Sequence, residues 1–79
     1  MTNTKVVLKR TKNNCSVMGF ANMFAMGDGP SFVVVDVKGK KALCAGNVVE
    51  ALFAHATRNF GPEVEAGAKV VPFADVVLS

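Results

Sequence analysis

The sequence predicts a small α+β fold: a mostly antiparallel sheet of about four to five strands, covered by one amphipathic helix. Three observations carry this prediction. Apolar residues make up 51% of a chain of 79 residues, which suits a packed core. A valine-rich run at 32–37 is typical of a central strand, and apolar residues at helical spacing follow Asn47. Residues 1–79 show no linker or repeat, so we expect a single domain with the order β-β-β-β-α-β.

The first strand is expected at Thr4–Thr11, where Val6 and Leu8 share one face. Its lysines suit an edge strand, because charge discourages edge-to-edge pairing. Asparagines make 12–14 a predicted turn, and 15–20 is then expected to return as the second strand of a hairpin. Residues 21–26 fit either a continued strand or a helical turn. Gly27-Asp28-Gly29-Pro30 predicts a break.

The strongest strand is predicted at Phe32–Val37, because the run 33–35 is apolar on both faces. Asp36 and Gly39 occupy the first and fourth positions of an expected type I turn followed by a glycine bulge. Lys40–Cys44 is the expected partner strand, with Leu43 on one face and its two neighbours on the other.

One helix is expected after residue 47, with Asn47 as its N-cap and Glu50 completing a capping box. An apolar stripe should bury it against the sheet: Val49, Leu52, Phe53, Ala56 and Phe60. Gly61 and Pro62 predict its end, and a polar loop with Glu63 and Glu65 should follow. Lys69–Val71 is expected as a strand, and Pro72 either limits it to one-sided pairing or ends it. The apolar residues 73–78 should dock on the body in a form the sequence does not specify.

The net charge of +3 is unevenly distributed. Residues 1–27 carry four basic side chains and no acid, whereas 28–79 carry five basic and six acidic ones. We expect one basic end built from Lys5, Lys9, Arg10, Lys12, Lys38, Lys40 and Lys41. Such a surface attracts phosphates or an acidic protein patch, and it also serves simply to keep the chain soluble. Without Trp or Tyr for base stacking, any nucleic-acid binding is expected to be non-specific phosphate contact.

Residues 17–26 form a Met/Phe segment with three methionines, two phenylalanines and no charge. The segment completes the core, or it forms an adaptable docking surface, or it makes the seam of a homodimer. On the docking hypothesis, Met23 and Phe24 contact the partner.

The residues that carry chemistry are few. Cys15, Cys44 and His55 have no paired metal-ligand spacing, and no glycine-rich phosphate loop occurs, so we expect no metal site and no cofactor. His55 lies about 12 Å along the predicted helix from its start, so a Cys44–His55 pair is not expected. The sequence therefore predicts that the protein is not an enzyme.

Lysines interrupt the N-terminus before an apolar stretch can form, and the longest uncharged stretch is too short to cross a bilayer, so we expect a cytoplasmic protein without a membrane partner. The expected function is that of a small regulatory protein that docks on a larger machine. A phage- or mobile-element-encoded inhibitor of a host polymerase or defence complex is one such role. The alternatives are a nucleic-acid-binding accessory protein and a self-assembling structural subunit.

Overall fold

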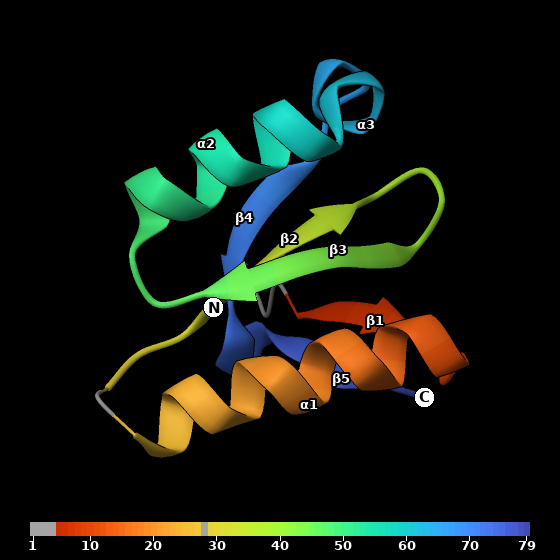
Figure 1. Ribbon diagram of the computed structural model, residues 1–79. Helices are drawn as coiled ribbons and strands as arrows, with labels where there is room; N and C mark the ends of the chain where they lie inside the picture. The colour runs from red at the N-terminus through yellow and green to blue at the C-terminus, as the bar shows by residue number, and fades with distance from the viewer. Residues whose placement is uncertain (1–4, 28) are drawn as a thin grey trace.

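A three-stranded antiparallel sheet forms the middle layer of the protein, and helices cover both of its faces (Figure 1). The computed structural model describes residues 5–27 and 29–79. Thr4, the expected start of the first strand, and Asp28, in the expected break, lie outside these residues. The elements are β1 (Val6–Leu8), α1 (Lys12–Met26), β2 (Phe32–Asp36), β3 (Lys41–Gly46), α2 (Val49–Asn59), α3 (Gly61–Glu65), β4 (Lys69–Pro72), a 3-10 turn (Phe73–Asp75) and β5 (Val76–Leu78).

The middle sheet has the order β3-β2-β4, with β2 at its centre. Val33, Val34 and Val35 are all fully buried, which confirms the prediction of a central strand covered on both sides. The prediction for residues 69–71 is also confirmed: within the described segments β4 pairs with β2 alone, and it ends at Pro72.

A second, two-stranded sheet corrects the expectation of a mostly antiparallel arrangement. β1 pairs in parallel with β5, from Val6 with Val76 to Leu8 with Leu78. The two strands come from opposite ends of the chain, and such a pairing leaves no local signal in the sequence. The expected alternation within β1 is confirmed, since Leu8 is buried and Val7 is exposed.

The expected second strand at 15–20 is wrong, because these residues belong to helix α1. Thr11 caps the helix, accepting a hydrogen bond from the backbone N–H of Asn14 at 3.1 Å. The residues expected to form a turn, 12–14, are therefore its first turn. Asn14, Met18 and Ala21 form the buried face, at intervals of four and three residues typical of a helix. A buried polar residue in that stripe hides the helical period from the sequence.

The connection from β2 to β3 matches the predicted turn in part. The backbone N–H of Gly39 donates to Oδ1 of Asp36 at 3.2 Å, but Lys40 rather than Gly39 has positive φ, at 51°. A register shift opposite Val34 and Val35 places an extra residue in β3. Leu43 and Cys44 consequently pack together toward α2, while Ala42 packs toward α1, which corrects the expected alternation.

Helix α2 lies where the apolar spacing predicts it, but its cap and buried face differ. Val48 is the N-cap and makes no side-chain hydrogen bond, so the Asn47 capping box is wrong. Leu52 and Ala56 are buried, whereas Val49 and Phe53 are exposed. The apolar stripe that the sequence predicts is wider than the buried face of α2, because the sheet covers only part of the helix surface. The expected polar loop contains α3, with Pro62 in its first turn.

The two faces of the middle sheet have separate cores. One joins β2, β3 and β4 to α1 and β1: Leu8, Met18, Ala21, Val33, Val35, Ala42 and Val71. The other joins the sheet to α2: Val34, Leu43, Leu52, Ala56 and Ala68. The apolar tail docks on the first core through Phe73, Val76 and Leu78, as expected. Two helices on opposite faces thus replace the single helix that the sequence predicts.

Candidate functional site

The seven basic side chains expected to form one basic end divide into two groups. Lys5 donates from Nζ to the carbonyl of Ala74 at 3.1 Å, and Arg10 donates from Nη2 to the carbonyl of Leu78 at 3.3 Å. These two cations therefore lie against the C-terminal segment. The remaining five stay exposed near the start of α1 and the β2–β3 turn: Lys9, Lys12, Lys38, Lys40 and Lys41.

One buried side chain ties the two parts of this basic end together. Nδ2 of Asn14 donates to the carbonyl of Lys9 at 2.9 Å and to that of Lys40 at 3.3 Å. The segment before α1 and the β2–β3 turn therefore lie side by side. A small pocket of about 260 Å³ opens nearby, and Lys5, Lys40 and Lys69 are among the residues that line it.

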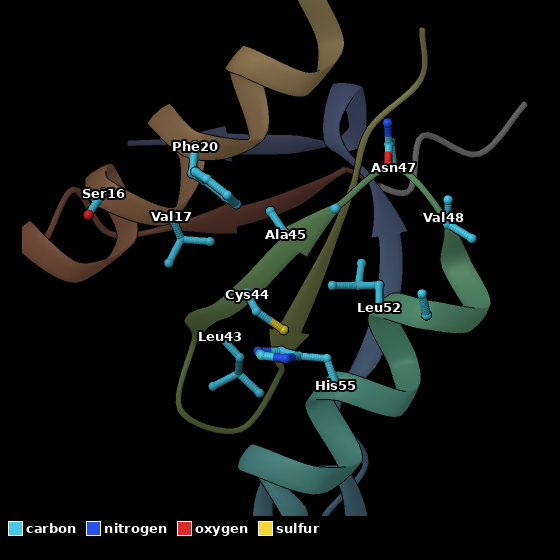
Figure 2. Close-up of a pocket in the computed structure, with 12 residues that line it drawn as sticks. Ser16, Val17, Phe20, Leu43, Cys44, Ala45, Asn47, Val48, Leu52 and His55 are labelled. Atoms are coloured by element: carbon cyan, nitrogen blue, oxygen red, sulfur yellow. The ribbon is translucent and has the colours of Figure 1, made fainter. Parts of the chain in front are cut away.

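The larger cavity is an apolar groove of about 680 Å³ between α1 and α2, with β3 at its floor (Figure 2). Val17 and Phe20 approach β3 from α1 on one side, and Leu52 and His55 approach it from α2 on the other. Cys44 and its neighbours on β3 lie between these two walls. The groove is open to solvent, since half of the Phe20 side-chain surface is exposed.

The floor of the groove is an edge of the middle sheet, because among residues 5–27 and 29–79 only β2 pairs with β3. Ala42 is the first residue on this edge whose backbone groups face away from β2, and both groups already have hydrogen-bond partners. The N–H of Ala42 donates to Oδ1 of Asn14 at 2.9 Å, and its carbonyl accepts from Nδ2 of Asn13 at 2.9 Å. Side chains of α1 thus close the edge at the start of β3.

The next outward-facing residue is Ala45, which pairs with Val33 of β2. On the far side of β2, the N–H of Phe73 donates to the carbonyl of Ser31 at 2.8 Å, so Ser31 faces β4. Because backbone groups alternate along an antiparallel strand, Val33 also turns toward β4. The N–H and C=O of Ala45 therefore point away from β2, into the groove that Ala45 lines.

The Met/Phe segment is divided by the helix that contains it. Met18 is buried in the first core, while Met23 is 70% exposed. Phe24 is half-buried and packs edge-on against Phe20, with ring centroids 4.9 Å apart. Phe20, which the sequence did not single out, is thereby fixed at the mouth of the groove. One face of α1 therefore belongs to the core, and another face is exposed on the surface.

Cys44 and His55 line the same groove, although no pairing between them was expected. The connection from β3 to α2 is short, and it folds the helix back along the strand. Burial raises the pKa of the Cys44 thiol, the opposite of what an activated nucleophile needs. His55 faces the amide of Asn59, with Nδ1 and Nδ2 3.3 Å apart. Among the residues described, no three potential ligands are placed to hold a metal ion.

No protein-family model, curated protein or solved structure matches this chain. In the described part of the chain, no helix is both long enough and apolar enough to cross a membrane.

Proposed function

We propose that the protein is a small, non-enzymatic binding domain that docks on a partner protein through the groove between α1 and α2. The observation that carries this proposal is the open apolar groove beside a strand edge whose Ala45 backbone groups face into it. Exposed apolar surface is costly to leave in water, and backbone groups at a free strand edge are a template for pairing with another chain, so a protein partner can cover the one and pair with the other.

The exposed apolar face of α1 extends the docking surface beyond the groove. Phe20 and Met23 lie three residues apart and are both exposed, so they share one side of the helix. Phe and Met side chains suit such a surface, because aromatic residues and methionine are enriched in protein interfaces. The sequence predicts Met23 and Phe24 as the residues that contact the partner. The proposed contact residues are instead Phe20 and Met23, and Phe24 packs against Phe20.

Affinity capture with matched variants tests the proposal. Phe20→Asp and Met23→Asp should each abolish capture of the partner, since a charge would be buried at an apolar interface. Val7→Asp is the control, because Val7 is equally exposed but lies on β1, outside the groove. All three variants should keep the parent's melting temperature within a few degrees. Capture that survives both α1 variants would show that the partner binds elsewhere.

A nucleic-acid-binding accessory function is the second candidate. It is favoured by the contact of Asn14 with both Lys9 and Lys40, which brings the two basic segments of the sequence to one end of the molecule. Exposed lysines there would neutralise phosphates without reading sequence.

The role of a phage- or mobile-element-encoded inhibitor of a host polymerase or defence complex is one instance of the proposed function. A cytoplasmic location belongs to the same proposal. Identification of the captured partner by mass spectrometry tests both.

A further inference from the structure

We infer that the groove takes an extended segment of the partner protein, which adds an antiparallel strand to the free edge of β3. The inference rests on the proposed function and specifies how the partner binds. Its partner class is a peptide with a short run of successive apolar residues and with acidic residues at its C-terminal end.

The backbone of β3 determines the mode of binding. At Ala45, both N–H and C=O face the groove, so an added strand would exchange two hydrogen bonds with one residue of the peptide. Asn13 and Asn14 occupy the corresponding groups of Ala42. The added strand is therefore short, and it pairs with the second half of β3 and the residues that follow.

The two walls determine the side-chain pattern. A strand added to the middle sheet points its side chains alternately to the two faces. On one face they meet Val17 and Phe20 of α1, and on the other they meet Val48 and Leu52 of α2. Both walls are largely apolar, so the peptide is expected to be apolar at successive positions across the groove.

The edge of β3 is recessed between two helices, and this favours a peptide over a second copy of this chain as the occupant of the groove. β3 lies at the floor of the groove, and α1 and α2 form its walls (Figure 2). In a symmetric dimer, each β3 edge would have to meet another edge recessed between the same two helices, and the helices would collide first. An extended segment without flanking helices reaches the floor.

Charge gives the direction of the peptide. Lys12, Ser16 and Phe20 are spaced four residues apart on α1, so Lys12 continues the groove wall toward the start of β3. Lys41 is the first residue of β3. β2 is antiparallel to both β3 and β4 in the middle sheet. A further strand added antiparallel to β3 would place its C-terminal end beside these lysines. Acidic residues there complement the charge.

Selection from a phage-displayed library of random 12-residue peptides tests the inference on the intact chain. We expect a run of successive apolar residues followed by Asp or Glu in the selected sequences. With the best peptide, exchange of the Ala45 amide hydrogen should slow at least about tenfold, while the Ala42 amide, already bonded to Asn14, should change little. Lys12→Glu combined with Lys41→Glu should weaken binding about tenfold.

Ala45→Pro is the matched backbone variant. It removes an outward-facing N–H and no bond to β2, so an edge strand tolerates it. We expect it to weaken peptide binding at least about tenfold, because a hydrogen bond is lost and the ring obstructs the added strand. Should this variant not fold, peptides N-methylated at single positions should show the same loss on the wild-type chain.

Several results would overturn the inference. No enrichment, enrichment of helical periodicity, or unchanged exchange at Ala45 would each exclude strand addition. A dimer in sedimentation that Ala45→Pro dissociates would show that a second copy fills the groove. If capture still depends on Phe20 in these cases, the proposed function stands and strand addition alone is wrong. If capture is insensitive to Phe20 and Met23, the proposed function itself is wrong.

Discussion

The side chain of Asn14 connects three parts of this protein: the segment before α1, the β2–β3 turn and β3. It is 1% exposed, and its amide makes hydrogen bonds to Lys9, Asn13, Lys40 and Ala42. Ser31 is buried to a similar degree, but its hydroxyl finds no partner among the described residues. The two residues therefore separate the effect of a bonded polar group from that of an unbonded one.

Asn14→Ala should lower the free energy of unfolding by about 2–4 kcal/mol. The substitution leaves the Ala42 N–H and the Lys9 and Lys40 carbonyls without their side-chain partner, and each unsatisfied buried group costs about 1–3 kcal/mol where water cannot reach it. Ser31→Ala should leave stability unchanged or raise it slightly, since no bond is lost. Urea denaturation measures both. Equal losses in the two variants would contradict this account of Asn14.

At the scale of the element, α1 is the largest departure from the sequence prediction, and Gly19 tests it. Gly19 lies within α1, and a Cβ there would meet no atom within 4 Å. Gly19→Ala should therefore stabilise the protein by about 0.5–1 kcal/mol, because glycine is a poor residue inside a helix.

Gly67→Ala is the control for this prediction. A Cβ at Gly67 is equally free of contacts, but its φ of +111° strains any other residue. We expect a loss of about 1 kcal/mol or more there. A stabilising effect at Gly67, or a destabilising one at Gly19, in thermal or urea unfolding would contradict the backbone described for these segments.

The buried face of α2 gives a second prediction at this scale. Leu52 is 5% exposed in the core between α2 and the sheet, whereas its neighbour Phe53 is 42% exposed. Leu52→Ala should cost about 2–5 kcal/mol of stability, and Phe53→Ala less than about 1 kcal/mol. The sequence alone predicts equal losses, so the difference between the two urea midpoints decides which face of α2 is buried.

The elements that the sequence predicts well are those whose signal is local. The β2 strand is apolar at three successive residues, and the end of α2 coincides with Gly61-Pro62. The errors arise where tertiary contacts override local patterns. Asn14 is buried because its amide is hydrogen-bonded to the nearby backbone of Lys9 and to the distant backbone of Lys40 and Ala42. A sequence pattern shows none of these bonds, so the apolar stripe of Met18 and Ala21 appears interrupted at Asn14. The pairing of β1 with β5 joins positions about seventy residues apart.

The groove was even less accessible to sequence reasoning. Met23 could be singled out from composition, and its exposure agrees with a docking role. The wall residues Val17 and Leu52 look like ordinary core positions, because nothing in their neighbourhood shows that α1 and α2 flank an open edge. The availability of Ala45 depends on strand order and on the β3 bulge, and neither is encoded in a motif.

At the scale of the whole molecule, the two surfaces proposed for binding, one apolar and one basic, meet at the start of β3. The apolar groove begins beyond Ala42, and the exposed lysines gather before it, around the start of α1 and the β2–β3 turn. A partner that carries an apolar segment next to acidic groups would engage both surfaces at once. Nucleic acid would engage the basic end alone, so removal of the lysines distinguishes the two proposed functions.

The triple substitution Lys9→Ala, Lys12→Ala and Lys41→Ala makes this separation. Arg10 is left in place because its side chain donates a hydrogen bond to the carbonyl of Leu78. This bond connects the segment before α1 to the C-terminal strand β5. The three lysine side chains are exposed, so the melting temperature should stay within a few degrees of the parent's. If nucleic acid is the partner, affinity should fall alike for every sequence. The slope of log affinity against log salt should decrease by up to about 2–3 units, because each lost phosphate contact removes about 0.9.

If an acidic protein segment is the partner, the same variant should associate more slowly with it, with a smaller change in the dissociation rate. Fluorescence anisotropy with a random-sequence duplex and a single strand, across a salt series, gives the first readout, and stopped-flow association with the captured partner gives the second. Arg58→Ala is the control, since Arg58 lies in the last turn of α2, and it should move neither quantity appreciably. Failure of the unaltered protein to bind either nucleic acid at about 50 mM salt would remove the accessory function from consideration, because electrostatic binding is strongest there. An unchanged association rate with the protein partner would leave the apolar groove as the whole of the docking surface and the lysines as a device for solubility.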